Sequence, residues 1–510
     1  MTLPERRVTL GEFFDVGVKK LPARLGPRRR EPDHVPPEPR SGAAPAGHRS
    51  VDDPRRSALA IGVGGNVLIT LSGISPASSV FILGGAAFAG YGTGVFWGFI
   101  LAGVISLLVA LCYAELGSRH PLAGGDYTLV SRVLGPAAGS AVFFISLISL
   151  PLIVAIFALG VADYLGVAIA GLDPLWTAVV VIVLATVTAC FNIRTNAWVT
   201  GAFLFIEMAA LAYLTVLGAI HIERPLSDLL NPQALNDAGG LAPLGIAGLV
   251  LAVTQGIFSY NGYGGAIYFA EETKDARRTI AKALLWSAVI TVLAEIIPLT
   301  AIMLGADTLE ELFGADLPVE SFLSARSGDA VSTVILIAIA LAIVNAIIAI
   351  VLQAGRLLFA AARDGAMPPA VAGRLARVSP RTRMPVASTI TMGVIALIGC
   401  FVPFDVLLNA TGSTLAFSYG FIALAAFVVR RQPDVAGGSY RMPWWPLPPV
   451  IAMVAIATIF VIGILDPAQW LSLGISAGII AAGFLYYALY LRANPGAIHL
   501  LEADDDERTA

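Results

Sequence analysis

Twelve apolar runs divide this chain, and each is about 20 residues or longer, enough to cross a hydrocarbon core roughly 30 Å thick. Hydrophobic residues make up 57% of the chain and charged residues 13%, with the charges lying mainly between the runs. A soluble chain would carry about a quarter charged residues. The sequence therefore predicts an all-α integral membrane protein with 12 transmembrane helices. The runs lie near 57–88, 93–116, 136–170, 175–191, 197–220, 244–269, 279–304, 331–362, 385–403, 404–429, 446–465 and 471–491.

The positions of Lys and Arg predict the orientation. With the N-terminus placed inside, every Lys and Arg except Arg224 and Arg326 falls in an inner segment. Positive residues collect on the cytoplasmic side of membrane proteins. We therefore expect a multi-pass protein of the cell membrane with both termini cytoplasmic, in contact with the lipid bilayer and without a nucleic acid partner.

The first apolar run is interrupted in its middle by the sequence Leu71-Ser-Gly-Ile-Ser-Pro-Ala-Ser-Ser79. Proline and turn residues break a helix there, and lipid cannot satisfy the backbone groups that the break releases. Such a break must be buried in protein or line a cavity. Because half-helix ends hold small charged solutes in membrane proteins, the first interpretation is a transporter.

The sixth run is also interrupted, at Phe258-Ser-Tyr-Asn-Gly-Tyr-Gly-Gly265, where glycines and polar residues oppose helix formation. Five spans separate the start of one broken span from the start of the other, and this odd number gives the two five-helix units opposite orientations, as in the inverted repeats of secondary transporters. The alternative for a single break is a glycine-lined packing face. The predicted divisions are a disordered basic tail (1–56), a first repeat (57–220), an extracellular loop (221–243), a second, inverted repeat (244–430), helices 11 and 12 (431–492) and an acidic tail (493–510).

These residues carry a family resemblance. The chain resembles permeases of the amino acid/polyamine/organocation (APC) superfamily, whose LeuT-like fold is a five-plus-five inverted repeat with broken helices 1 and 6 and two extra C-terminal helices. The matching pieces, which together extend from about residue 57 to 430, are the break before Val80-Phe81, Pro121–Tyr127, Phe258–Tyr263 with Glu271-Glu272 and Arg277–Thr279, and Arg356–Phe359 with Arg363-Asp364-Gly365 and Pro368.

One departure from the resemblance concerns the first break. Family members usually carry Gly-Ser/Thr-Gly-Ile/Val-Phe at this place, whereas the present chain reads Ala77-Ser78-Ser79-Val80-Phe81. The loss of both glycines narrows the room for a ligand beside the backbone, although Ser75-Pro76 opens the helix instead.

The two breaks predict a substrate site shaped for a zwitterion. Backbone N–H groups at Ala77, Ser78 and Ser79 would hold a carboxylate, and the serine hydroxyls are further donors. An ammonium group would be held by free carbonyls at Ile74, Ser75, Phe258, Ser259 and Asn261. The resemblance implies that Phe258 is an aromatic gate and that Tyr263 lines the pocket; ordinary packing aromatics are the alternative.

Glu207 is the candidate for ion coupling because it lies about ten residues into the fifth span, where a charge costs roughly 3 kcal/mol. In proton-coupled relatives a lysine stands at what looks like the same place. A glutamate there can gain and lose a proton as its exposure alternates, which predicts proton symport. The alternatives are a protonated structural glutamate and a partner for a cationic substrate. Glu295 is a second buried carboxyl, expected to make a structural bond, and Asn345 is expected to face the site.

The sequence therefore predicts a secondary active transporter that moves an amino acid or related amine by alternating access. An exchanger and a non-transporting nutrient sensor are the alternatives. No cofactor or metal site is expected, since Cys112, Cys190 and Cys400 are far apart and all five histidines lie in tails or loops. An enzyme is not expected either, because the serine turn at Gly73–Ala77 lacks a histidine base at membrane depth.

Overall fold

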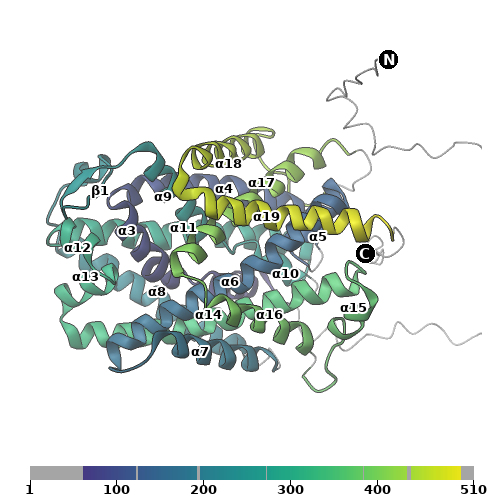
Figure 1. Cartoon of the computed structure of the whole chain (residues 1–510), viewed down its shortest axis with the longest axis horizontal. Helices are drawn as coiled ribbons and strands as arrows, with labels where there is room; N and C mark the ends of the chain where they lie inside the picture. Colours follow the sequence, from purple (N-terminus) through teal and green to yellow (C-terminus); the bar gives the residue numbers. More distant parts are fainter. Residues whose placement is uncertain are drawn as a thin grey trace, which may run out of the picture. The chain divides into compact units, whose positions relative to one another are not determined.

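The computed structural model describes residues 61–121, 124–191, 196–270, 273–382, 384–432 and 438–494. The predicted tail at 1–56 and the acidic end from residue 495 lie outside these residues, as does Glu271-Glu272 of the sequence motif. The described part is mostly helical, with long helices running side by side (Figure 1).

Within the described ranges, nine helical segments are long and apolar enough to cross a membrane. Three shorter apolar helices lie where the fourth, sixth and ninth runs are predicted, so the total of 12 spans stays a prediction. The long segments are Val63–Tyr91 (α1 to α3), α4 Gly94–Arg119, α6 Pro136–Ala168, α8 Asn196–Ile220, α11 Ala276–Gly305, α14 Asp329–Arg363, α17 Phe404–Val429, α18 Leu447–Leu465 and Pro467–Leu491, which contains α19 Trp470–Tyr486. The shorter ones are α7 Pro174–Ala189, α9 Ile246–Ser259 and α16 Val386–Gly399.

Small elements connect these helices. A two-stranded antiparallel sheet lies in the segment before α9, with Gln233 opposite Pro243 and Leu235 opposite Leu241. The strands are β1 Gln233–Leu235 and β2 Leu241–Pro243, and the short helices are α5 Asp126–Leu134, η4 Leu226–Leu230, α10 Gly265–Tyr268, α12 Leu309–Gly314, α13 Pro318–Ser327, α15 Pro369–Leu375, η6 Pro467–Gln469 and η7 Tyr487–Leu491.

The first broken span consists of α1 Val63–Ile74, α2 Pro76–Ser78, the π-helical segment η2 Ser79–Gly84 and α3 Gly85–Tyr91. The break is at Ser75, whose φ of 52° is left-handed, and Pro76 begins the next segment without an N–H to donate. The predicted interruption is therefore present at Ser75-Pro76.

The second broken span consists of α9 and α10, joined by the turn Tyr260–Gly264. Gly262 has a φ of +125°, and a Cβ on it would lie 2.8 Å from the Ile74 side chain. Only glycine therefore fits where the second break packs on the first.

Side-chain bonds align the two broken spans in opposite directions. Asn66 Nδ2 donates to the Ala266 carbonyl at 3.4 Å, whereas at the other end Gln255 Nε2 donates to the Leu83 carbonyl at 2.7 Å. The start of the first broken span thus lies beside the end of the second, and the end of the first lies beside the start of the second. The two broken spans lie side by side and antiparallel, with their breaks in contact.

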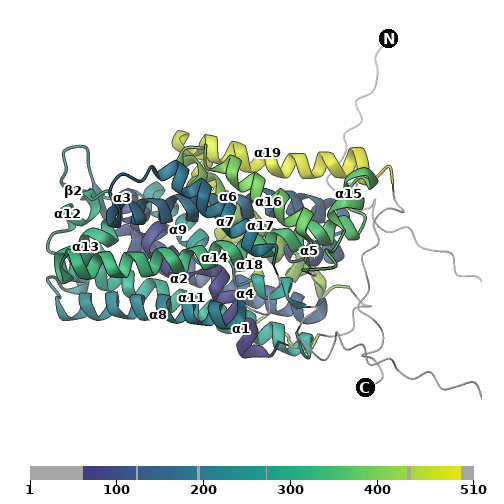
Figure 2. The same ribbon diagram turned by 90° about the horizontal axis from the view of Figure 1, so that it is seen from below.

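The broken spans are enclosed by long helices. α11 packs against α1, α4 and α8, and α14 packs against α6. In Figure 2, α8 and α11 lie beside each other and α19 follows the opposite edge. Gly218 of α8 lies so close to α11 that a Cβ on it would meet the Ala301 carbonyl oxygen at 2.2 Å. A small residue there permits this close helix contact.

His120 follows α4 directly and is predicted to make stability depend on pH. Burial lowers the pKa of His120 to about 4, and the charges of Arg132, Arg119 and Arg277 act in the same direction. In the unfolded chain its pKa is about 6.5, so between about pH 6.5 and 4 the unfolded state binds a proton that the folded state does not. Stability should therefore fall as the pH falls through this window.

His120→Gln should flatten that dependence. The measurement is the unfolding midpoint in detergent between pH 7.5 and 5, with His221→Gln as the control. A pH dependence equal to that of the unmodified protein would contradict the role of His120.

Candidate substrate-binding site

The serine-rich first break forms a compact hydrogen-bonded turn. The Ser75 carbonyl accepts from the Ser79 amide at 3.1 Å and from the Ser78 hydroxyl at 2.8 Å, while the Ser75 hydroxyl accepts from the Ser78 amide at 3.4 Å. The amides of Ser78 and Ser79 thus have partners inside the turn, as does the Ser75 carbonyl. Holding a substrate through these groups, together with Ala77 and Ile74, stays a prediction.

The second break is hydrogen-bonded to the first and to α11. The Ser259 carbonyl accepts from the Ser79 hydroxyl at 2.9 Å, and the Phe258 carbonyl accepts from the Asn261 amide at 3.0 Å. The Ser259 hydroxyl donates to Glu295 Oε2 at 2.7 Å. Three of the five carbonyls that were expected to be free, those of Ser75, Phe258 and Ser259, therefore already have partners, and Glu295 makes the expected structural bond.

Three buried tyrosines meet beside the second break. The ring centroids of Tyr113 and Tyr263 are 5.8 Å apart, and Tyr419 lies 6.3 Å from Tyr113 and 5.8 Å from Tyr263. Asn261 Nδ2 donates to the Tyr419 hydroxyl at 3.1 Å. Sequence reasoning placed Asn261 and Tyr263 here but missed Tyr113 and Tyr419. The available signal was a tyrosine within an apolar run, since a buried phenol usually has a polar partner.

Gly264 leaves the room that Tyr113 occupies in this cluster. A Cβ on Gly264 would lie 3.3 Å from the Tyr113 ring. The Tyr113 ring therefore fills the space that a side chain at position 264 would take.

Glu207 of α8 lies at the first break. It is fully buried, and its carboxyl faces the Ser75 hydroxyl and the Ala77 amide. Neither of its oxygens makes a hydrogen bond of good geometry with the described residues. Burying a charge there would be costly, because the polar groups that the carboxyl faces among the described residues are a hydroxyl and an amide.

Two amides of α14 reach the first broken span. Asn345 Nδ2 donates to the Ser72 hydroxyl at 2.7 Å. Gln353 Nε2 lies between Gly73 and Gly265, at 2.6 Å and 3.1 Å from the Cβ positions that these glycines lack. The two glycines thus make room for Gln353 where the broken spans meet.

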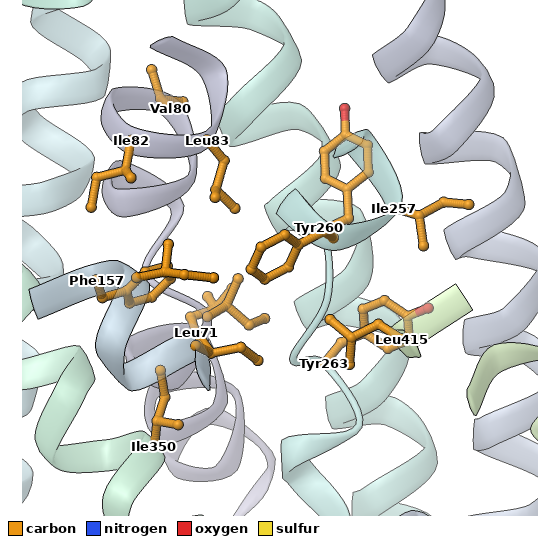
Figure 3. Close-up of a cluster of buried hydrophobic side chains, with 14 of the residues drawn as sticks. Leu71, Val80, Ile82, Leu83, Phe157, Ile257, Tyr260, Tyr263, Ile350 and Leu415 are labelled. Atoms are coloured by element: carbon orange, nitrogen blue, oxygen red, sulfur yellow. The ribbon is translucent and has the colours of Figure 1, made fainter. Parts of the chain in front are cut away.

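Apolar side chains surround the breaks. Figure 3 shows buried side chains of both broken spans in one cluster, among them Leu71 and Val80 of the first span and Ile257, Tyr260 and Tyr263 of the second. All five are buried, as is Phe258, whose Cβ lies against Gly412 of α17.

Asp126 begins α5 and closes one end of the tyrosine cluster. Its Oδ2 accepts from the Ser418 hydroxyl at 3.1 Å, and Tyr113 also faces it. Burial raises the pKa of Asp126, and the hydroxyl groups of Tyr113 and Ser418 oppose that rise. The carboxyl thus ties α5 to α4 and α17.

The fold and the antiparallel broken spans define a multi-pass membrane protein of the permease class. Residues 57–489 match the family described as Amino acid permease. The chain belongs to this family, whose members are transporters.

Three transport proteins illustrate the similarity, and this chain matches each of them over most of that protein's length. Branched-chain amino acid permease BcaP of Bacillus subtilis is 24% identical over 83% of this chain and 92% of its own. Methylthioribose transporter of the same organism is 25% identical over 83% and 92%. Large neutral amino acids transporter small subunit 2 of Oryctolagus cuniculus is 26% identical over 66% of this chain and 63% of its own.

Proposed function

We propose that this permease is a secondary active transporter that moves an amino acid or a related amine across the membrane, coupled to protons. The observation that carries the proposal is the contact between two broken antiparallel spans, with Gly262 of one packed on Ile74 of the other. Broken helices that meet at mid-membrane are where secondary transporters bind their substrates. The similarity to amino acid permeases agrees with this substrate class.

Alternating access follows from the inverted repeat that the antiparallel spans support. Two units of opposite orientation can exchange conformations around a fixed site, so that each side of the membrane has access in turn. The left-handed Ser75 and the turn at Gly262 are the places where the backbone of each span can bend.

The surroundings favour a substrate with an uncharged, apolar side chain. The side chains around the breaks are mainly aliphatic and aromatic (Figure 3), and the Tyr113 ring fills the space beside Gly264. Burying a charged side chain among them would cost free energy unless it were paired. Glu207 is the partner that a cationic substrate would use, which makes an amine the second candidate.

Counterflow in proteoliposomes tests the proposal. Vesicles loaded with unlabelled leucine, phenylalanine, lysine, putrescine or methylthioribose are diluted into the same labelled compound, with and without an inward proton gradient. We expect accumulation of leucine or phenylalanine, enhanced by the gradient. Selective accumulation of lysine or putrescine would instead support the amine.

The same vesicles, together with vesicles that contain no substrate, distinguish a symporter from a sensor, an exchanger and a sodium-coupled transporter. Substrate binding with no flux would support a sensor, and flux that requires substrate on both sides would support an exchanger. Uptake that depends on sodium and is indifferent to the proton gradient would contradict proton coupling.

A further inference from the structure

The Gln353 side chain of α14 reaches the place where the two broken spans meet. Its Nε2 lies 2.6 Å from the Cβ position that Gly73 of α1 lacks and 3.1 Å from that of Gly265, the first residue of α10. Because the spans are antiparallel, α1 and α10 are their halves on one side of the breaks. The amide therefore lies on that side, beside the contact between Gly262 and Ile74.

The amide is buried and its donor is unused. Gln353 is 5% exposed, and its Nε2 has no hydrogen-bond partner among the described residues. An amide nitrogen carries two N–H groups, and leaving them unpaired away from water costs free energy. Most buried polar side-chain atoms in proteins have a partner. The unpaired Nε2 between the two broken spans therefore needs a physical explanation.

Helix packing does not explain this amide. Asn345 lies two turns earlier on the same face of α14 and donates to the Ser72 hydroxyl at 2.7 Å. Ala349 lies between them, and its Cβ is 3.9 Å from the Cβ position of Gly73. This face of α14 thus contacts α1 through Asn345 and Ala349 already. At position 353 an apolar side chain of the same length would pack there without an unpaired donor.

The backbone donors that the sequence predicts for a carboxylate are engaged. The Ser78 amide donates to the Ser75 hydroxyl at 3.4 Å, and the Ser79 amide donates to the Ser75 carbonyl at 3.1 Å. Gln353 Nε2, by contrast, is a donor without a partner in the described part of the chain. A carboxylate oxygen is a strong acceptor for such a donor, because a hydrogen bond to an ionised group is stronger than one between neutral groups.

We propose that Gln353 binds the carboxylate of the amino acid substrate through Nε2, and this inference rests on the substrate class proposed above. The broken spans must part for a ligand to reach the amide, and Ser75 and Gly262 are where the backbone of each span can bend. With no side chain at Gly73 or Gly265, the amide is open to both spans as they part. A substrate carboxylate then supplies the partner that Nε2 lacks.

This role makes Gln353 a determinant of specificity between amino acids and amines. A ligand with a carboxylate satisfies the buried donor, whereas an amine without one leaves it unpaired. A site that is built to hydrogen-bond a ligand group discriminates strongly against the analogue that lacks the group. The amide is neutral, so it holds the carboxylate without pairing with the substrate's ammonium group.

Gln353→Met tests the proposal, because methionine keeps the unbranched shape of the side chain and removes the donor. Uptake of labelled leucine is measured against unlabelled leucine or isoamylamine, which is leucine without its carboxyl group. Gln353→Met should weaken leucine binding by about tenfold or more, the size of a hydrogen bond to a charged group, and change isoamylamine binding by about twofold at most. An unchanged preference for leucine over isoamylamine would overturn the proposal.

Thermal unfolding in detergent separates ligand binding from packing. Without leucine, Gln353→Met should unfold at the same temperature as the unmodified protein or higher, because it removes an unpaired buried donor. The stabilisation by added leucine should shrink, since that stabilisation follows binding affinity. A lower midpoint together with full stabilisation by leucine would assign Gln353 to packing and overturn the proposal.

A control and a second variant accompany Gln353→Met. Gln469→Met replaces another buried glutamine, in η6, and should keep both the preference for leucine and the stabilisation by leucine. Gln353→Glu keeps the shape of the side chain but places a carboxyl opposite that of the substrate, so leucine binding at pH 7.5 should fall by about tenfold or more. Full leucine binding by Gln353→Glu would contradict the proposal even if Gln353→Met folded poorly.

Failure of this inference can be told from failure of the proposed function. If the unmodified protein takes up leucine and Gln353→Met keeps its affinity and preference, only the role of Gln353 is wrong. If the unmodified protein carries putrescine and neither leucine nor phenylalanine, the proposed substrate class is wrong and the carboxylate site with it. Proton coupling does not enter this test, so leucine uptake that ignores the proton gradient would leave the role of Gln353 standing.

Discussion

Glu207→Gln is expected to retain substrate binding and to lose the stimulation of uptake by an inward proton gradient. Glutamine has nearly the shape of glutamate and can still face the Ser75 hydroxyl and the Ala77 amide, so the turn should be kept. It cannot release a proton, so the cycle should run without coupling. The measurement is uptake at external pH 5.5 and 7.5, with binding followed separately by ligand-induced thermal stabilisation.

The matched control for Glu207→Gln is Glu320→Gln, a carboxyl in the first turn of α13. Uptake by Glu320→Gln should respond to the proton gradient as uptake by the unmodified protein does. Should Glu207→Gln respond equally well, Glu207 would be a structural glutamate and the coupling group would lie elsewhere.

Glu115→Gln is expected to destabilise the protein by about 3–5 kcal/mol, the usual cost of removing one partner from a buried ion pair. Glu115 is fully buried in α4, where its carboxylate accepts from Arg119 at 2.8 Å and from both Arg430 Nε and an Arg430 terminal nitrogen at 2.7 Å. The Met442 amide donates to it at 3.1 Å. Losing the charge leaves two guanidinium groups without their shared anion.

Unfolding of the purified protein by denaturant in detergent measures this cost. Glu223→Gln is the control, because the pair that Glu223 forms with Arg326 at 3.1 Å is partly exposed and contributes about 0–1 kcal/mol at most. Equal stability of Glu115→Gln and the unmodified protein would show that the cluster is as weak as a surface pair.

The apolar runs and both breaks could be predicted from local sequence because their causes are local. A run of apolar residues in water is unfavourable at any place in the chain, and Pro76 interrupts a helix through its own ring and missing N–H. The interruption at Ser75 and the turn at Gly262 lie where the sequence predicts them.

The partners of the site residues could not be predicted in the same way. The amides of Ser78 and Ser79 looked free in the sequence, but they bond within their own turn. The Ser259 carbonyl looked free for a substrate, but it receives the Ser79 hydroxyl, 180 residues away in the chain. Tyr113 and Tyr419 were missed because nothing near them in sequence indicates that they meet at Tyr263.

The sequence by itself determined the class of protein, the interrupted spans and the buried glutamates, because hydropathy and helix breaking depend on neighbouring residues alone. The family followed from motifs in fixed order. Only the tertiary structure decided that Gln353 of α14 reaches between the two broken spans. Its position depends on how α14 and the two broken spans pack, and helix packing is set by contacts such as Gln353 on Gly73 and Gly262 on Ile74, far apart along the chain.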